Sequence, residues 1–208
     1  MLKIFDIQKS IKVNSFVFIF FSLISISFAQ KSKTTDPTIK IDTSSIYNGL
    51  KFRSIGPSLM SGRIADIVIH PNNENIWYVA VGSGGVWKTE NAGTTWNSLL
   101  DNQVSYSIGC IALDPQNPEI VWVGTGENVG GRHISYGDGI YKSEDGGKSW
   151  KNMGLKKSEH LSKIIIHPSN SNVIWVASQG PLWSKGGERG VYKSVDGGNS
   201  WKNMGLKN

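Results

Sequence analysis

The chain has 208 residues, a net charge of +6 at pH 7 and a single cysteine, Cys110. The mild positive charge comes without a cluster of Lys and Arg interleaved with aromatic residues, which argues against a nucleic-acid-binding protein. One cysteine allows no intrachain disulfide, and its apolar surroundings favour a small buried side chain over a nucleophile. Eight Trp and 24 Gly with almost no helical periodicity indicate many short strands joined by tight turns.

Residues 1–29 have the pattern of a secretory signal peptide. Three lysines precede an apolar run over residues 16–26, and Ser27, Phe28 and Ala29 form a small-x-small cleavage site. The run is shorter than the ~20 residues of a spanning helix, so we expect export and no membrane span. Cleavage removes three lysines and one aspartate and lowers the net charge to +4. The destination, whether periplasmic, cell-surface or secreted, stays open.

Residues 30–48 are rich in Lys, Ser, Thr and Asp and predict a flexible lead-in. From residue 49 onward the chain repeats one pattern three times, over about 49–102, 103–157 and 158–208. Each unit has an apolar strand that ends at a Pro turn and a second strand that carries Trp. A third strand ends in Lys-Ser or Lys-Thr, and a Gly turn closed by Trp leads to the fourth.

Four short strands in about fifty residues predict an all-β fold in which each unit is one blade of a β-propeller. The expected structure is therefore three four-stranded antiparallel sheets. The first strands are expected at Ile64–Ile69, Ile108–Leu113 and 161–166. Because these runs are almost wholly apolar, we expect neighbouring blades to cover both of their faces.

The turn between the third and fourth strands carries the most specific pattern. It matches the Asp-box, Ser/Thr-x-Asp-x-Gly-x-Thr/Ser-Trp, in which Asp or Asn accepts backbone hydrogen bonds, Gly takes a positive φ and Trp packs beneath the hairpin. The residues in these roles are Asn91, Gly93, Trp96, Asp145, Gly147, Trp150, Asp196, Gly198 and Trp201. Their role is predicted to be structural, because the ligand spacing of a calcium loop is missing. No metal site and no cofactor are predicted.

A family resemblance is carried by residues 53–57, 61–66, 80–88 and 124–128, in addition to the turns. Residues 52–208 resemble the amino-terminal part of large exported bacterial proteins with a sortilin-type, Asp-box (BNR) repeat propeller, often labelled glycosyl hydrolases. The resemblance implies the fold more than the activity, because such propellers include sialidases, xyloglucan hydrolases, peptide receptors and assembly factors.

Three blades are too few to close a ring, since known propellers have about four to eight. We therefore expect the chain to be the front part of a larger propeller, with the remaining blades of a full-length chain as its partners. Residues 50–55 are expected to pair with a last blade. The first and third blades should each leave one apolar face uncovered, which makes the isolated segment 30–208 poorly soluble or oligomeric.

One spacing varies between the units and indicates where a ligand binds. The distance from the first Trp to the Lys is 11, 20 and 18 residues, so the extra length lies between the second and third strands. In a four-stranded meander this loop opens on the side where the chain enters the first strand, opposite the Gly turns. We call this side the loop face. Its Gly, charged and aromatic residues suit a glycan or an extended peptide.

The candidate ligand-binding residues of the loop face are Arg63, Tyr106, Glu127, Asn128, Arg132, Glu159 and His160. The longer loops add His133, Tyr136, Asp138, Gln179, Trp183, Lys185, Glu188 and Arg189.

Three functions remain open. The main hypothesis is an exported sortilin-like module that binds a peptide, a protein or a glycan. The alternatives are a glycoside hydrolase of the Asp-box propeller type and a cell-envelope scaffold or assembly factor. Hydrolysis needs two facing carboxyls, for which Glu127, Asp138 and Glu159 are available. In the xyloglucan-cleaving members that the resemblance includes, a catalytic Asp precedes a Gly-Gly pair after the second strand. Gly82 takes that position here, so no catalytic residue is assigned.

Overall fold

The computed structural model describes residues 63–131 and 133–207, which form twelve β-strands. The predicted signal peptide (1–29), the lead-in (30–48) and the expected ring-closing segment (50–55) lie outside the described residues. Within the described part, no helix is long and apolar enough to cross a membrane.

The strands form three four-stranded antiparallel sheets, each with its strands in chain order. The first sheet contains β1 (Ile64–Ile69), β2 (Trp77–Val81), β3 (Gly85–Thr89) and β4 (Asn97–Ser98). The second contains β5 (Ile108–Leu113), β6 (Val121–Thr125), β7 (Ile140–Ser143) and β8 (Lys151–Asn152). The third contains β9 (Leu161–His167), β10 (Asn170–Ser178), β11 (Gly190–Ser194) and β12 (Lys202–Gly205). The predicted fold class is confirmed.

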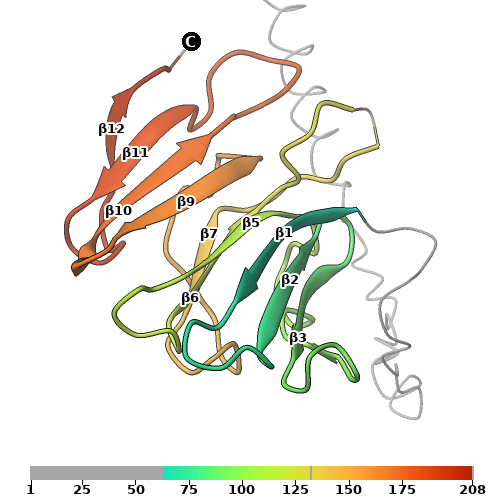
Figure 1. Cartoon of the computed structure of the whole chain (residues 1–208). Helices are drawn as coiled ribbons and strands as arrows, with labels where there is room; N and C mark the ends of the chain where they lie inside the picture. The colour runs from blue at the N-terminus through green and yellow to red at the C-terminus, as the bar shows by residue number, and fades with distance from the viewer. Residues whose placement is uncertain (1–62, 132, 208) are drawn as a thin grey trace, which may run out of the picture. The chain divides into compact units, whose positions relative to one another are not determined.

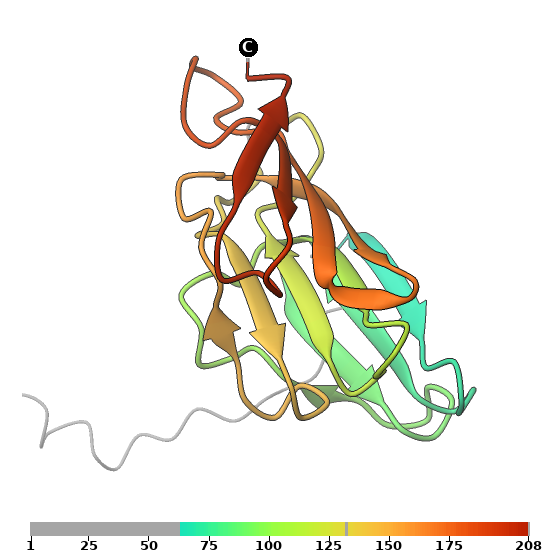
Figure 2. The same cartoon turned by 90° about the vertical axis from the view of Figure 1, so that its left-hand side faces the viewer.

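The sheets pack face to face with their first strands next to one another. Strand β5 lies between β1 and β9 in Figure 1. Figure 2 shows the three sheets following one another in chain order, from blue-green to red. Apolar residues of the first and second sheets share one buried cluster around Tyr78 and Ile111. A second cluster around Trp122 and Ile164 joins the second and third sheets.

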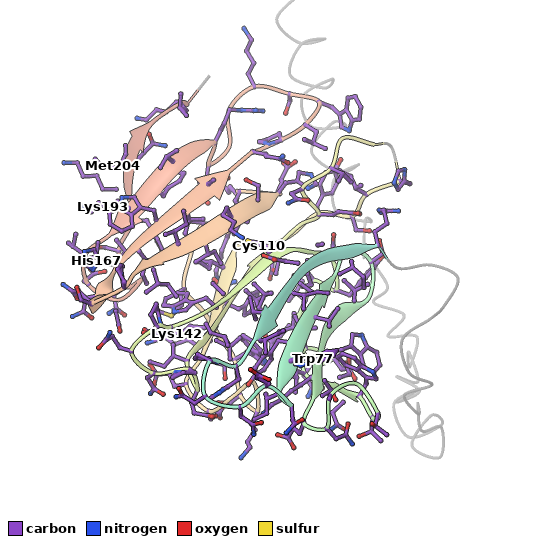
Figure 3. All side chains as sticks on the ribbon, in the orientation of Figure 1. Trp77, Cys110, Lys142, His167, Lys193 and Met204 are labelled. Carbon is purple, nitrogen blue, oxygen red and sulfur yellow. The ribbon has the colours of Figure 1, made fainter. Side chains whose placement is uncertain are left out.

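A lysine lies over an aromatic ring at the same position of every sheet. The Nζ atom of Lys88 is 5.4 Å from the ring centroid of Tyr78, and that of Lys142 is 5.6 Å from Trp122. In the third sheet, Lys193 lies 5.1 Å from Trp175. Such cation–π contacts are favourable, and the lysine stem covers apolar surface. Figure 3 labels Lys142 and Lys193.

Both faces of β5 are covered by neighbouring sheets, whereas β1 and β9 each leave one face exposed, as expected for the first and third of three blades. Ile67 and Ile69 of β1 are 52% and 53% exposed, and Ile165 of β9 is 57% exposed. Ile111 of β5, at the position equivalent to Ile67, is only 2% exposed. The reason is that, among the described residues, β5 has a sheet on each side, whereas β1 and β9 have one.

The Gly turns hold their acidic residue by short-range hydrogen bonds. Oδ1 of Asp145 accepts bonds from the Ser149 N–H at 2.8 Å and from the Ser143 hydroxyl at 2.7 Å. In the third sheet, Oδ1 of Asp196 accepts the equivalent bonds from the Ser200 N–H and the Ser194 hydroxyl. In the first sheet, Oδ1 of Asn91 accepts the Thr95 N–H at 2.8 Å. Donation by Ser149 holds the pKa of Asp145 at about 2.

The turn tryptophans also reach the preceding sheet, which the sequence did not predict. Nε1 of Trp150 donates to the Leu99 carbonyl at 2.9 Å, and Nε1 of Trp201 donates to the Met153 carbonyl at 2.8 Å. Each tryptophan therefore joins two neighbouring sheets in addition to packing under its own hairpin.

We expect Asp145→Ala to lower the free energy of unfolding by about 1–2 kcal/mol, because it removes hydrogen bonds that hold the turn. Urea unfolding of the variant and its parent measures the loss. Since the pKa of Asp145 is depressed, its stabilising contribution is present near neutral pH and is lost as the pH falls from about 4 towards 2. Asp145→Asn is the matched control, because Asn91 already fills this role in the first sheet. An unchanged unfolding midpoint for Asp145→Ala would contradict the structural role.

Candidate functional site

The loop face has the same backbone arrangement in all three sheets. In each sheet, the residue that follows the second strand donates its N–H to the carbonyl of the residue that precedes the first strand. The pairs are Gly82 to Arg63 at 2.7 Å, Gly126 to Ser107 at 2.6 Å and Gln179 to His160 at 2.9 Å. Side chains at these positions therefore project from equivalent places in adjacent sheets.

Arg63 and Glu127 form an ion pair between the first and second sheets. Nε and Nη2 of Arg63 donate to the two carboxylate oxygens of Glu127 in a bidentate contact. The Glu127 side chain is 2% exposed and that of Arg63 is 44% exposed. The hydrogen bond to Glu127 raises the pKa of Arg63. Because the Glu127 carboxylate is buried and both of its oxygens are bonded to Arg63, it is not free to contact a ligand.

Gly82 provides the space for this ion pair. A Cβ atom at residue 82 would lie 2.6 Å from both Cδ and Oε1 of Glu127. The Glu127 carboxylate thus occupies the volume that a side chain on residue 82 would need. Residue 82 is also the position that the family resemblance matches to a catalytic Asp, and the structure leaves no room for one while Glu127 is in place.

His160 is completely buried at the start of the third sheet. Its Nδ1 lies 2.8 Å from the carbonyl oxygen of Glu127, so in the neutral ring Nδ1–H is the donor and Nε2 is an acceptor. Nε2 has no hydrogen-bond partner among the described residues. Burial lowers the pKa of His160, which favours this neutral form. The ring of Tyr136 lies beside it, with 5.5 Å between centroids.

Gln179 lies next to His160 and is also incompletely bonded. Its Nε2 donates to the carbonyl of Asn128 at 3.0 Å, while its Oε1 is buried without a partner in the described part of the chain. The hydroxyls of Ser158 and Ser178 are likewise buried without a hydrogen-bond partner among the described residues. Leaving a buried polar atom unpaired costs about 1–3 kcal/mol, so these atoms mark a place where water or a ligand completes the hydrogen bonding.

Three aromatic side chains of the loop face are exposed. Tyr106 and Tyr136 are each 58% exposed, and Trp183 is 67% exposed. The hydroxyl of Tyr106 lies 3.1 Å from Oγ of Ser135 in the loop after β6, which fixes the position of its ring. Exposed rings of this kind offer apolar faces to a ligand, with polar groups close by.

The three carboxylates considered for hydrolysis are in different states. Glu127 is paired with Arg63, and Asp138 accepts the hydroxyl of Tyr141. Burial and this bond raise the pKa of Tyr141 to about 12. The carboxylate of Glu159 has no hydrogen bond or ion pair within the described residues, although its carbonyl accepts the Gly137 N–H at 2.7 Å. Two of the three carboxylates are therefore already engaged within the fold.

The structure connects several predicted site residues. Arg63, Glu127 and His160 form one chain of contacts across the three sheets, and Asn128 joins it through Gln179. Arg132 lies outside the described residues. The space that Gly82 leaves for the Glu127 carboxylate was not predicted from the sequence, because no sequence pattern indicates it. Among residues 63–131 and 133–207, no group of three or more His, Cys, Asp or Glu side chains could hold a metal ion.

A hollow of about 360 Å³ lies away from the loop face, along the first strands of the three sheets. Its lining is mainly apolar and includes Ile69, Ile111 and Ile165, and among the described residues Lys163 is its one charged lining residue. The Lys163 Nζ lies 3.4 Å from the carboxylate of Asp66, so this charge is already paired. The hollow therefore has little that would orient a polar ligand.

Comparison with known proteins relates the chain to xyloglucanases. No protein-family model matches it. The "Xyloglucanase" of Hypocrea jecorina is 26% identical over 151 residues, which cover 66% of this chain and 17% of that enzyme. The "Oligoxyloglucan-reducing end-specific xyloglucanase" of Emericella nidulans is 20% identical over 156 residues, covering 69% of this chain and 18% of that enzyme. The crystal structure of an ancestral GH74 enzyme matches 68% of this chain and 18% of its own, with 27% identity and a TM-score of 0.54.

The chain spans less than a fifth of the length of these relatives. They support a propeller-type fold similar to part of a glycoside hydrolase. These relatives do not support the sortilin-type part of the resemblance. They also do not support a peptide or protein ligand.

Proposed function

We propose that this chain supplies part of the glycan-binding face of a glycoside-hydrolase-type β-propeller, with xyloglucan or a similar β-linked glucan as the ligand. The observation that carries the proposal is the 26% identity to a xyloglucanase over 151 residues, together with the fold shared with a GH74 enzyme. The proposal favours the hydrolase alternative over a sortilin-like peptide receptor. It includes export through residues 1–29 and further blades that complete the ring.

The chemistry of the loop face fits a neutral glycan. A sugar ring has apolar faces and hydroxyl edges, and the exposed rings of Tyr106, Tyr136 and Trp183 supply flat apolar surface. The charge of Arg63 is balanced by Glu127, so this part of the face does not select an anion. The buried acceptors of His160 and Gln179, which have no hydrogen-bond partner within residues 63–131 and 133–207, suit the hydroxyl donors of a sugar.

Within this proposal the described sheets bind and orient the glycan, while the acid–base chemistry belongs to other blades. Glycoside hydrolysis needs two carboxyls that face each other, one of them able to donate a proton. Glu127 is locked in its ion pair, and residue 82 has no side chain. The chain alone should therefore bind xyloglucan oligosaccharides without cleaving them.

Isothermal titration calorimetry with a xyloglucan heptasaccharide tests the proposal. We expect saturable binding, no release of reducing sugar, and at least a tenfold loss of affinity in Trp183→Ala, because an aromatic contact at a binding site often contributes more than about 1.4 kcal/mol. Val195→Ala is the control, since Val195 is an exposed apolar residue in a turn on the opposite side. Binding of peptides with no affinity for any glucan oligosaccharide would overturn the assignment.

A further inference from the structure

We propose that Nε2 of His160 and Oε1 of Gln179 form a two-acceptor subsite that binds two neighbouring hydroxyl groups of one pyranose ring. The identity of the ligand rests on the proposed function. The existence of the subsite rests on the hydrogen bonding of the two side chains.

The two side chains are held side by side by the backbone. The Gln179 N–H donates to the His160 carbonyl at 2.9 Å, which places the two residues across from each other at the edge of the third sheet. Their side chains bond to consecutive carbonyls of the second sheet's loop, His160 to Glu127 at 2.8 Å and Gln179 to Asn128 at 3.0 Å. Both are therefore anchored at one end, with the other end free.

The anchored ends determine the chemistry of the free ends. Because Nδ1 of His160 faces a carbonyl oxygen, it must carry the hydrogen, and Nε2 is left with a lone pair. Flipping the Gln179 amide would place two oxygens against each other, so the Oε1 assignment also holds. Both free atoms are buried acceptors without a partner among the described residues. Their ligand must bring two donors.

The two acceptors select a ligand that brings donors. A carboxylate or phosphate ligand brings acceptors and would face acceptors. The buried carboxylate of Glu127 is paired with the guanidinium of Arg63, while the partly buried Glu159, next to His160 in the chain, has no ion pair among the described residues. Neighbouring hydroxyls of a sugar ring supply two donors without net charge.

The ring of Tyr136 borders the pair. Its centroid lies 5.5 Å from that of the His160 ring, and Tyr136 is itself 58% exposed. The hydroxyl of Tyr136 has no hydrogen bond within the described part of the chain. The proposal requires this ring to turn into solvent, so that Nε2 opens to a ligand.

Nitrogen-15 NMR of the imidazole rings tests the subsite directly in the unmodified chain. Titration with xyloglucan heptasaccharide, and separately with methyl glucoside at high concentration, should shift the unprotonated Nε2 resonance of His160. The resonances of His70 and His167, which lie at the opposite end of the sheets, should stay in place. A glucoside that lacks one of two neighbouring hydroxyls should bind about tenfold more weakly, the usual effect of one lost hydrogen bond.

Gln179→Met should reduce heptasaccharide affinity about tenfold, whereas Gln116→Met, the same change at an exposed glutamine in the turn between β5 and β6 on the opposite side, should leave it unchanged. If the heptasaccharide binds while Nε2 stays unshifted, the subsite is wrong and the proposed function stands. If only the simple glucoside shifts Nε2, the subsite stands and xyloglucan is the wrong ligand. If no sugar shifts Nε2, a trapped water is the partner of the pair and the subsite is overturned.

Discussion

Gly109→Ala is expected to prevent the second and third sheets from packing, with a loss of more than about 4 kcal/mol in the free energy of unfolding. A Cβ atom at residue 109 would lie 2.0 Å from the carbonyl oxygen of Leu161 and 2.4 Å from that of Gly126. Both are backbone atoms, so relief of the clash requires β9 of the third sheet to move away and the end of β6, in the same sheet as residue 109, to shift as well. Soluble yield and a thermal melt followed by circular dichroism measure the effect.

Gly130→Ala is the matched control, because a Cβ there meets no heavy atom within 4 Å. Its stability should stay within about 0.5 kcal/mol of the parent. If Gly109→Ala instead had the same melting temperature as Gly130→Ala, the close approach of β5 to the third sheet would be incorrect.

Arg63→Met is expected to lower the free energy of unfolding, because it leaves the buried carboxylate of Glu127 without its partner. The loss should fall short of that for a fully buried pair, since the Arg63 side chain is 44% exposed and water can partly replace it. The midpoint of guanidinium-induced unfolding measures the loss.

Two comparisons separate the ion pair from a general effect of substitution. The double variant Arg63→Met with Glu127→Gln should recover much of the loss, because no unpaired charge remains. Glu144→Gln removes the partner of Lys142 in a pair whose glutamate side chain is 72% exposed, and its effect should be within about 0.5 kcal/mol. Equal losses in Arg63→Met and Glu144→Gln would show that Glu127 is better hydrated than its burial indicates.

The strands and their pairing could be predicted from the sequence because their causes are local. The expected bounds Ile64–Ile69 and Ile108–Leu113 are those of β1 and β5. Both are mainly apolar runs that contain β-branched residues, and both are followed at two residues' distance by a proline, which cannot donate to a sheet. Repetition of the pattern then fixed the number of sheets.

For the candidate site, the sequence predicted only the side of the sheets on which its residues lie. The loop lengths placed Arg63, Glu127 and His160 on one side, but their contacts depend on the angle between adjacent sheets, which no local pattern encodes. Arg63 and Glu127 are 64 residues apart in the chain. For the same reason, the bonds from Trp150 and Trp201 to the preceding sheets were not foreseen.

The choice between a peptide and a glycan ligand also lay beyond the residues themselves. Exposed tyrosines and polar loops serve both kinds of ligand, so the sequence alone left the two open. The similarity to xyloglucanases favours the glycan.

Cys110 lies at the contact between the second and third sheets, which we call the seam, and its reactivity reports the opening of that contact. Its side chain is 1% exposed where β5 faces the third sheet, and it is labelled in Figure 3. Burial raises the pKa of the thiol to about 12, so almost no reactive thiolate exists while the seam is closed. Alkylation therefore requires that the second and third sheets separate locally. As this is the one cysteine of the chain, the labelling rate reports how often that seam opens, without any substitution.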